Sequence, residues 1–392
     1  MNFRRTGVNN QGKKILNYKF IESESELKHV CDDLLKEKVI AVDLEADSMH
    51  CFKEKICLIQ IASAKEAFLV DPFEIKEVSC FLNVLENHDV MKVFHGSDFD
   101  IRSLDRDYHA QVNNLFDTEI ACRFLGIKER GLAALLKRNF DVDADKKFQK
   151  VDWAKRPLKQ AMIEYSVGDV AYLVELQDII HGRLKEKKRL AWAKEEFEIQ
   201  VQVRYENNHT FPLFRKFKGA GKMDNRSLAV LENLLEMRLS IAQKKDQPLF
   251  KIISNPSLMT MAWEKPVTID QILKIRALSR KQADMYGNLC VDAVVKAMQL
   301  EHGALPAYPK TRRPKKDALI QERIKRLKKL REKLSGSLGI EPGFLLNNAV
   351  IASIAVANPA TPEELLTIEQ VRQWQVEAMG RDIVSLLGYC RS

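Results

Sequence analysis

Two acidic residues, Asp43 and Glu45, follow directly after a run of apolar residues at 39–42. A short apolar run rich in β-branched side chains predicts a buried strand. Residues two apart on a strand point to the same face, so both carboxylates project together. Paired carboxylates that lose hydration repel each other, and a divalent cation is the usual way to offset that cost. The pair therefore indicates either a metal site or the end of a strand that reaches solvent.

A second acidic pair, Asp98 and Asp100, follows another apolar segment, Met91 to Phe94. This segment predicts a strand that passes through Gly96 into a helix, and functional residues of α/β proteins gather at such strand ends. Asp98 suits the N-cap of the helix, which leaves Asp100 as the candidate ligand. His95 is expected to be a strand-end histidine held by a hydrogen bond, without a ligand role.

A tyrosine and an aspartate, Tyr165 and Asp169, stand four residues apart in a predicted long helix from Lys159 to Glu186. A helix places residues at this spacing on one face. For an isolated pair, an ordinary surface contact would explain the spacing. The pair becomes informative when it is considered with the other three carboxylates.

Together these residues resemble the DEDD exonuclease family in its tyrosine-bearing branch. Its three motifs stand in order as DLE at 43–45, HGSDFD at 95–100 and YSVGD at 165–169. Supporting matches are CLIQIAS at 57–63, FDTEIACRFLG at 116–126 and DWAKRPL at 152–158. The resemblance implies an α/β ribonuclease H-like domain, with a mixed five-stranded sheet and flanking helices. It also implies the catalytic residues Asp43, Glu45, Asp100, Tyr165 and Asp169.

Phosphodiester hydrolysis requires an activated water and relief of charge on the leaving oxygen, and two divalent ions about 4 Å apart supply both. Carboxylate oxygens suit Mg²⁺ or Mn²⁺, whereas the sequence offers no His/Cys cluster for zinc. The resemblance implies that Asp43 bridges two such ions. Glu45 and Asp169 would hold the ion that carries the attacking water, and Asp100 the other, mostly through water. Tyr165 would orient the nucleophile.

The elements that position these residues are also predicted from the pattern of apolar residues. Segments 56–61 and 67–70 read as strands that form an antiparallel meander with the first strand. Ser23 to Lys36 predicts a helix, and residues 1–20 are expected to be loosely ordered. A linker is expected to open at Ala191.

The second half of the chain is predicted to be helical. Asp224 to Lys244 reads as an amphipathic helix with an aspartate N-cap. The GAGK sequence at 219–222 lacks the spacing of a phosphate-binding loop. The order of segments from FKGAGKMDNRSLAVLENLLEMR to TIDQILKI resembles an HRDC domain, a small helical nucleic-acid-binding module. The segment with Trp374 and Gly380 resembles a second, more diverged one. A coiled coil or partner-binding helix is the competing interpretation of 317–334.

The predicted organisation is therefore one α/β domain followed by two all-α HRDC-type domains. We expect the exonuclease domain at 1–190, the first HRDC domain at 207–300, a basic linker at 301–316 and the HRDC-like domain at 317–392. This order resembles the ribonuclease D family.

Charge and cysteine usage bear on partners and compartment. The 392 residues carry a net charge of +9. Between Arg312 and Lys333, eleven Lys/Arg oppose three Asp/Glu, a net of +8, which predicts a phosphate-bearing partner. The seven cysteines show no CxxC pair and fit a reducing cytosol. The amino terminus lacks an apolar signal region, so we expect a cytoplasmic protein. We also expect no membrane partner and no organic cofactor.

The leading hypothesis is a metal-dependent 3′–5′ exoribonuclease that releases nucleoside 5′-monophosphates, with tRNA precursors as the RNA partner. The first motif also resembles exosome-associated and Werner-type relatives, so an exonuclease acting on DNA ends is the second hypothesis. Sugar preference depends on contacts to the 2′-OH, which the sequence does not define. A catalytically inactive nucleic-acid-binding protein is the third hypothesis. Nothing in the sequence indicates an oligomeric state.

Overall fold

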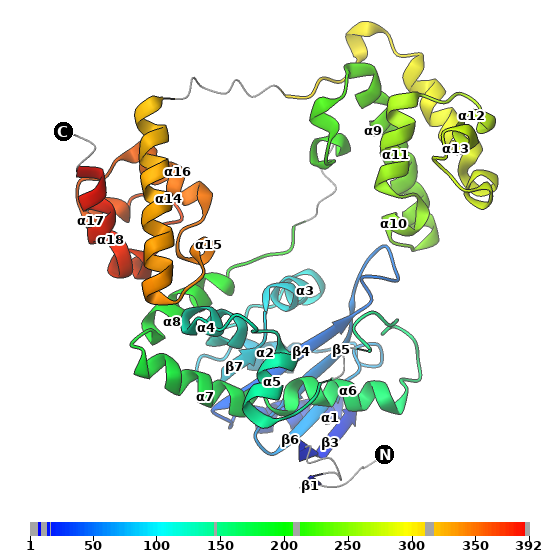
Figure 1. Ribbon diagram of the computed structural model, residues 1–392. Coiled ribbons are helices and arrows are strands. Elements are labelled where there is room, and N and C mark those ends of the chain that lie inside the picture. The colour runs from blue at the N-terminus through cyan, green and yellow to red at the C-terminus, as the bar shows by residue number, and fades with distance from the viewer. Residues whose placement is uncertain are drawn as a thin grey trace. The chain divides into compact units, whose positions relative to one another are not determined.

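The computed structural model describes residues 17–144, 147–206, 212–309 and 317–388, together with the backbone of strands β1 (Gly7–Val8) and β2 (Lys14–Ile15) (Figure 1). Residues 310–316 of the expected basic linker, with Arg312, and also Cys390, lie outside the described residues. The chain divides into two compact units. Unit 1 comprises Met1–Ala46, Ile56–Tyr205 and Arg313–Ser392, and unit 2 comprises Asp47–Lys55 and Glu206–Arg312.

A six-stranded mixed sheet forms the centre of unit 1, in the order β3–β6–β5–β4–β7–β8. The strands β4, β5 and β6 form the expected antiparallel meander. Strand β7 runs parallel to β4 and β8 parallel to β7. The bounds are β3 (Asn17–Ile21), β4 (Val39–Ala46), β5 (Ile56–Ala62), β6 (Glu66–Val70), β7 (Met91–Phe94) and β8 (Leu115–Asp117).

The sixth strand, β3, was not expected, because residues 1–20 read as loosely ordered. It pairs in parallel with β6 along its whole length, from Asn17 opposite Glu66 to Ile21 opposite Val70. Edge pairing satisfies backbone groups that a short polar segment cannot satisfy alone. The ribonuclease H-like fold class is thus confirmed, with one strand added at the edge of the sheet.

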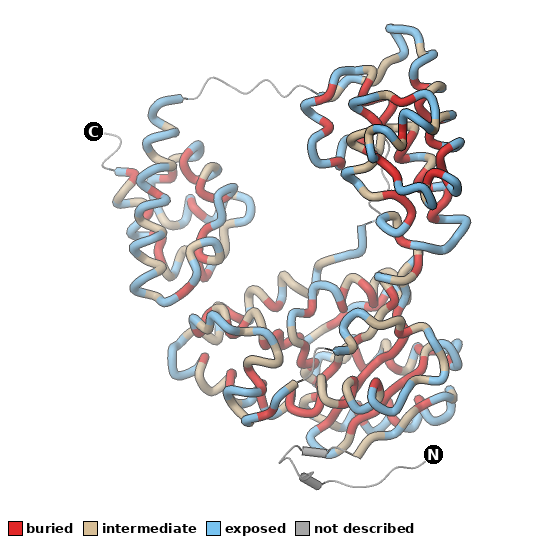
Figure 2. Tube along the Cα trace, turned by 45° about the vertical axis from the view of Figure 1, so that its right-hand side comes forward, coloured by how far each residue is buried: buried red, intermediate tan, exposed pale blue. Residues whose placement is uncertain are grey.

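Helices pack against this sheet, and most residues of its strands are buried; buried residues are the red stretches of the tube in Figure 2. Helix α6 packs on β4, β5 and β6, and α7 packs on β4 and β7. The single helix expected here is two helices, which meet at the buried Tyr172, whose ring packs 5.1 Å from Phe140. The helices that precede α8 are α1 (Glu24–Leu34), α2 (Ser79–Glu86), α3 (Asp98–Tyr108), α4 (Thr118–Leu125), α5 (Leu132–Phe140), α6 (Gln160–Ala171) and α7 (Leu173–Glu186).

The linker expected from Ala191 is instead helix α8 (Leu190–Gln200). Its Phe197 is buried, with the ring centroid 5.0 Å from that of Phe116 on β8. This packing against the edge strand explains the helix, because the local sequence has only a weak amphipathic pattern. Among the described residues, none of the helices combines the length and apolarity needed to cross a lipid bilayer.

Unit 2 is helical and has an apolar core of its own. Asp224 caps α9 as expected, because its carboxylate accepts a hydrogen bond from the Ser227 backbone N–H at 2.8 Å. The GAGK segment forms the 3₁₀ turn η2 (Ala220–Lys222). The helices are α9 (Asn225–Lys245), α10 (Leu249–Ile252), α11 (Asn255–Glu264), α12 (Ile269–Lys274) and α13 (Arg280–Met298).

The carboxyl-terminal helices form a bundle within unit 1. Helix α14 packs on α16 and α18 and buries Leu327 completely. Its apolar seam is therefore a bundle contact, which argues against the competing coiled-coil interpretation. The helices are α14 (Ala318–Leu338), α15 (Pro342–Leu345), α16 (Asn348–Ala357), α17 (Pro362–Leu365) and α18 (Gln373–Gly388).

Two carboxylates of α8 fasten this bundle to the exonuclease domain. Glu195 accepts hydrogen bonds from the first backbone N–H groups of α18, at Gln373 (2.7 Å) and Trp374 (2.8 Å). Glu196 accepts the indole N–H of Trp374 at 2.7 Å. The Trp374 ring lies 5.0 Å from that of Phe124 in α4. The capped N-terminus of α18 and the buried ring of Trp374 therefore stabilise the same contact between the bundle and the exonuclease domain.

A cavity of about 400 Å³ lies beside this contact, between α4 and α14. A Cβ atom on Gly126 would stand 2.2 Å from the carbonyl oxygen of Gly339, so the two chain segments approach too closely for a side chain there. Arg130 lines the cavity and is paired with Glu119 at 2.6 Å and Glu341 at 3.0 Å. These ion pairs make the cavity part of the interface between the bundle and the exonuclease domain.

Trp374 is expected to dominate the stability of this contact. Trp374→Ala should lower the free energy of unfolding by about 3–5 kcal/mol, the usual cost of truncating a fully buried aromatic residue. Chemical denaturation followed by circular dichroism measures this change. Leu319→Ala is the control, because Leu319 is 61% exposed and its loss should change stability by about 0.5 kcal/mol or less. Equal effects of the two substitutions would contradict the docking contact.

Candidate metal centre

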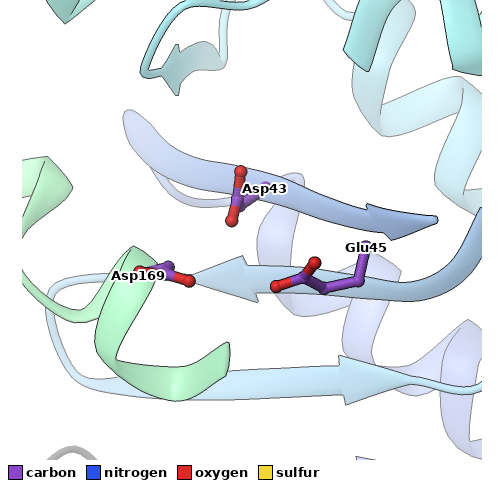
Figure 3. Close-up of side chains that lie close together, drawn as sticks. All are labelled: Asp43, Glu45 and Asp169. Atoms are coloured by element: carbon purple, nitrogen blue, oxygen red, sulfur yellow. The ribbon is translucent and has the colours of Figure 1, made fainter. Parts of the chain in front are cut away.

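The structure brings together three carboxylates that are distant in the sequence. Asp43 and Glu45 project from the same face of β4, as their spacing predicts, and Asp169 projects from α6. One oxygen from each lies within 4.8 Å of the others. Figure 3 shows the three side chains pointing into one common space. A group of carboxylates this close is a candidate cation site.

Strand pairing fixes the first two members of this group. Asp43 lies opposite Gln60 of β5, and Glu45 lies opposite Leu58. The register then shifts between Glu45 and Ala46, because Ala46 lies opposite Ile56. The extra residue, Cys57, lies on β5, so the regular pairing of the two strands ends directly beyond the acidic pair.

The third member, Asp169, is accompanied by Tyr165 one helical turn earlier. The Tyr165 hydroxyl donates a hydrogen bond to the Asp169 carboxylate. The Tyr165 ring packs 5.6 Å from Phe148 and 6.1 Å from Trp153. Burial and the nearby carboxylates raise the pKa of Tyr165, so the phenol stays protonated and can act as a donor.

Asp100 lies close to this group but outside the set of three that share the 4.8 Å limit. It is buried in the first turn of α3. Burial, followed by the nearby charge of Asp43, raises the pKa of Asp100, and Asp100 contributes in turn to the raised pKa of Glu45. All four predicted carboxylates therefore influence one another electrostatically.

The loop before Asp100 is held by a residue that the sequence reasoning did not single out. Asp117 at the end of β8 accepts hydrogen bonds from the backbone N–H groups of Gly96 (3.1 Å) and Ser97 (2.7 Å). It also caps α4 through Glu119 and Ile120. Its position in the quoted segment FDTEIACRFLG, at a strand end before a helix, was the available signal.

Two expectations about this loop have different outcomes. The N-cap residue of α3 is Ser97, so the expectation that Asp98 fills this position is wrong. Asp98 instead pairs with Arg102 one turn later, at 3.0 Å, since Asp117 already holds the loop. His95 is a strand-end residue as expected, with Nδ1 2.9 Å from the hydroxyl of Thr118.

The electrostatics of the cluster suit a divalent cation. Burial raises the pKa of Asp43 to about 7. Burial, followed by the charges of Asp43, Asp169 and Asp100, raises the pKa of Glu45 to about 10. Burial and the Asp43 charge also hold the pKa of Asp169 well above its usual range. The donors are hard oxygens, and their repulsion falls when a divalent cation lies between them, so the residues fit Mg²⁺ or Mn²⁺.

Comparisons with known proteins identify both an exonuclease domain and HRDC domains in this chain. A profile of the 3′–5′ exonuclease family matches residues 18–185. A profile of the HRDC domain matches twice, at residues 227–294 and 320–387. The first match contains all five predicted site residues, and the second and third cover the helical modules, including the more diverged one.

Among curated relatives, ribonuclease D of Desulfotalea psychrophila is 27% identical over 340 residues, which cover 85% of this chain and 89% of that protein. Protein RRP6-like 3 of Arabidopsis thaliana is 31% identical over 280 residues, and this chain spans only 31% of its length. Among solved structures, ribonuclease D of Escherichia coli superimposes with a TM-score of 0.72 at 22% identity. That match covers 95% of this chain and 99% of the other, and it supports the fold.

The raised pKa values predict how ion-free stability depends on pH. A folded chain with raised carboxylate pKa values binds more protons than the unfolded chain, so the free energy of unfolding falls as pH rises. The fall should begin above about pH 4, the ordinary carboxylate range. It should continue through about 7 for Asp43 and about 10 for Glu45. Thermal melts of the chelator-treated protein at several pH values measure this trend.

Added Mn²⁺ should reverse the loss, and its effect should grow with pH. We expect a rise of several °C at about pH 8 and a smaller rise at about pH 5, because ligand carboxylates must lose their protons to bind. Asp43→Asn should weaken both the pH trend and the response to Mn²⁺. A response of equal size at both pH values would argue against binding at these carboxylates.

Proposed function

The chain belongs to the ribonuclease D family of 3′–5′ exonucleases, and from this premise we propose that it removes nucleotides from RNA 3′ ends and releases nucleoside 5′-monophosphates. The observation that carries the proposal is the convergence of Asp43, Glu45 and Asp169 within 4.8 Å, with Asp100 electrostatically coupled to them. These residues come from three separate stretches, and no core-packing need brings buried carboxylates together.

We assign roles to the five site residues on this basis. Two Mg²⁺ or Mn²⁺ ions held by Asp43, Glu45, Asp100 and Asp169 would supply the activated water and neutralise the leaving oxygen. Asp43, which influences each of the other carboxylates, suits the shared position. Tyr165 stays protonated and is braced by two rings, so its hydroxyl can orient the attacking water.

RNA is the proposed substrate, because the relatives that match along most of the chain are named ribonuclease D. tRNA precursors are the proposed RNA, as the family resemblance implies. Lys325, Lys329 and Lys333 are exposed and four residues apart on α14, so they form a single row. Such a row suits a phosphate backbone. The cations at the start of this stretch, Arg312, Arg313, Lys315 and Lys316, lie outside the described residues.

The domain boundaries remain a proposal: exonuclease 1–190, HRDC 207–300, linker 301–316 and HRDC-like 317–392. Helix α8 supports moving the end of the exonuclease domain to about residue 200, because it packs on β8. A cytoplasmic location is likewise proposed, supported by six described cysteines that are free thiols.

A matched pair of aspartates, two residues apart on α3, tests the site. Asp100→Asn should lower hydrolysis of a 5′-labelled RNA by more than about 100-fold, because losing even a hydrogen-bond partner of a metal ligand costs about 10–100-fold and Asp100 is proposed to hold the ion itself. Asp98→Asn should retain activity, because the exposed Asp98–Arg102 pair contributes only about 0–1 kcal/mol. A product ladder shortened from the 3′ end, with nucleoside 5′-monophosphates as product, is the expected readout. Full activity of Asp100→Asn would refute the assigned site.

RNA and DNA oligomers of matched sequence test the substrate class. We expect RNA to be degraded roughly five- to tenfold faster, since one hydrogen bond to the 2′-OH contributes on the order of 1 kcal/mol. Initial rates at equal substrate concentration, with Mg²⁺ and then Mn²⁺, give the ratio. Faster degradation of DNA would favour the second hypothesis, an exonuclease acting on DNA ends.

A further inference from the structure

A buried glutamine on β5, Gln60, has no hydrogen-bond partner for its side chain. The residue is 0% exposed, and among the described residues neither the amide oxygen nor the amide nitrogen finds a partner. A buried amide without a partner costs about 1–3 kcal/mol. The neighbouring β5 residues Ile59 and Ile61 are apolar, so an apolar residue at position 60 would suit the core better.

The position of Gln60 in the sheet places it beside the carboxylate cluster. It lies directly opposite Asp43 in the antiparallel pairing of β4 and β5. Residues opposite each other in such a pair project to the same face, with Cβ atoms about 4.5–5.5 Å apart. Helix α6, which carries Asp169, packs on both strands. The unpaired amide of Gln60 is therefore adjacent to Asp43, the carboxylate whose charge raises the pKa of the other three.

The chemistry of an amide suits this neighbour. It offers two N–H donors and a carbonyl acceptor without adding a charge to a cluster that already holds four carboxylates. A carboxylate that binds cations is usually oriented by a hydrogen bond from a polar group behind it. The Gln60 amide stands opposite Asp43 on the neighbouring strand, and among the described residues it has no other partner that would hold it away from this role.

We propose that Gln60 is a positioning residue for Asp43: its amide hydrogen-bonds the Asp43 carboxylate, directly or through one water, when cations occupy the cluster. The proposal rests on the proposed function, because it requires that the cluster binds cations. The amide has no partner among the described residues, and in this proposal its cost is offset when cations occupy the cluster. Gln60 thus lowers the free energy of unfolding of the protein without cations, and it fixes the orientation of Asp43 when cations bind.

The test is Gln60→Leu in the full chain, read by ion binding as well as by activity. Melting temperature is measured without divalent ions and then as a function of Mn²⁺ concentration. We expect the ion-free melting temperature to stay equal or rise, because an unpaired amide is removed. The Mn²⁺ concentration for half the maximal shift should rise by about 10–100-fold, the usual effect of losing an outer-shell partner. High Mn²⁺ should restore most of the hydrolysis rate.

Two further variants separate positioning from packing. Gln177→Leu is the matched control, since Gln177 is a buried glutamine of α7, and its Mn²⁺ midpoint should equal that of the wild type. Gln60→Met keeps the length of the side chain and replaces Gln60→Leu if that variant does not fold. An unchanged Mn²⁺ midpoint in Gln60→Leu or Gln60→Met overturns the proposal. Absence of any Mn²⁺ shift in the wild type would instead refute the ion site itself.

Discussion

The repulsion among four carboxylates packed beside one sheet is the constraint on which the rest of the structure depends. Asp43, Glu45 and Asp169 share a space less than 4.8 Å across, and Asp100 adds a fourth interacting charge. Burial raises the pKa of all four, and repulsion from neighbouring carboxylates raises further those of Glu45, Asp100 and Asp169. The fold supplies the energy that keeps these groups together, through a sheet and helices that share one buried apolar core.

Several parts of the fold are explained by the need to hold these carboxylates in place. Strand β4 is central: its first residues, 39–41, pair with β7, and Asp43 and Glu45 are fixed by pairing with β5. The loop before Asp100 is tied to the end of β8 by Asp117, and Tyr165 is braced by two aromatic rings. Rigid supports of this kind are expected where charged groups must be preorganised.

The two helical modules belong to different compact units of the chain. The carboxyl-terminal bundle is part of unit 1, where Glu195 and Glu196 of α8 hold Trp374 at the start of α18. The first HRDC domain forms most of unit 2, with a separate core. A basic helix anchored to the exonuclease domain and a second, distinct module are consistent with a substrate larger than the nucleotide being removed.

The sequence by itself determined the residue types and their local geometry. Spacing of two on a strand and of four on a helix are backbone periodicities, so the pairing of Asp43 with Glu45 and of Tyr165 with Asp169 followed without a structure. Only the tertiary structure decided the edge strand β3, helix α8, the restraint by Asp117 and the unpaired amide of Gln60. These features depend on strand order and register between distant segments, which no local pattern encodes.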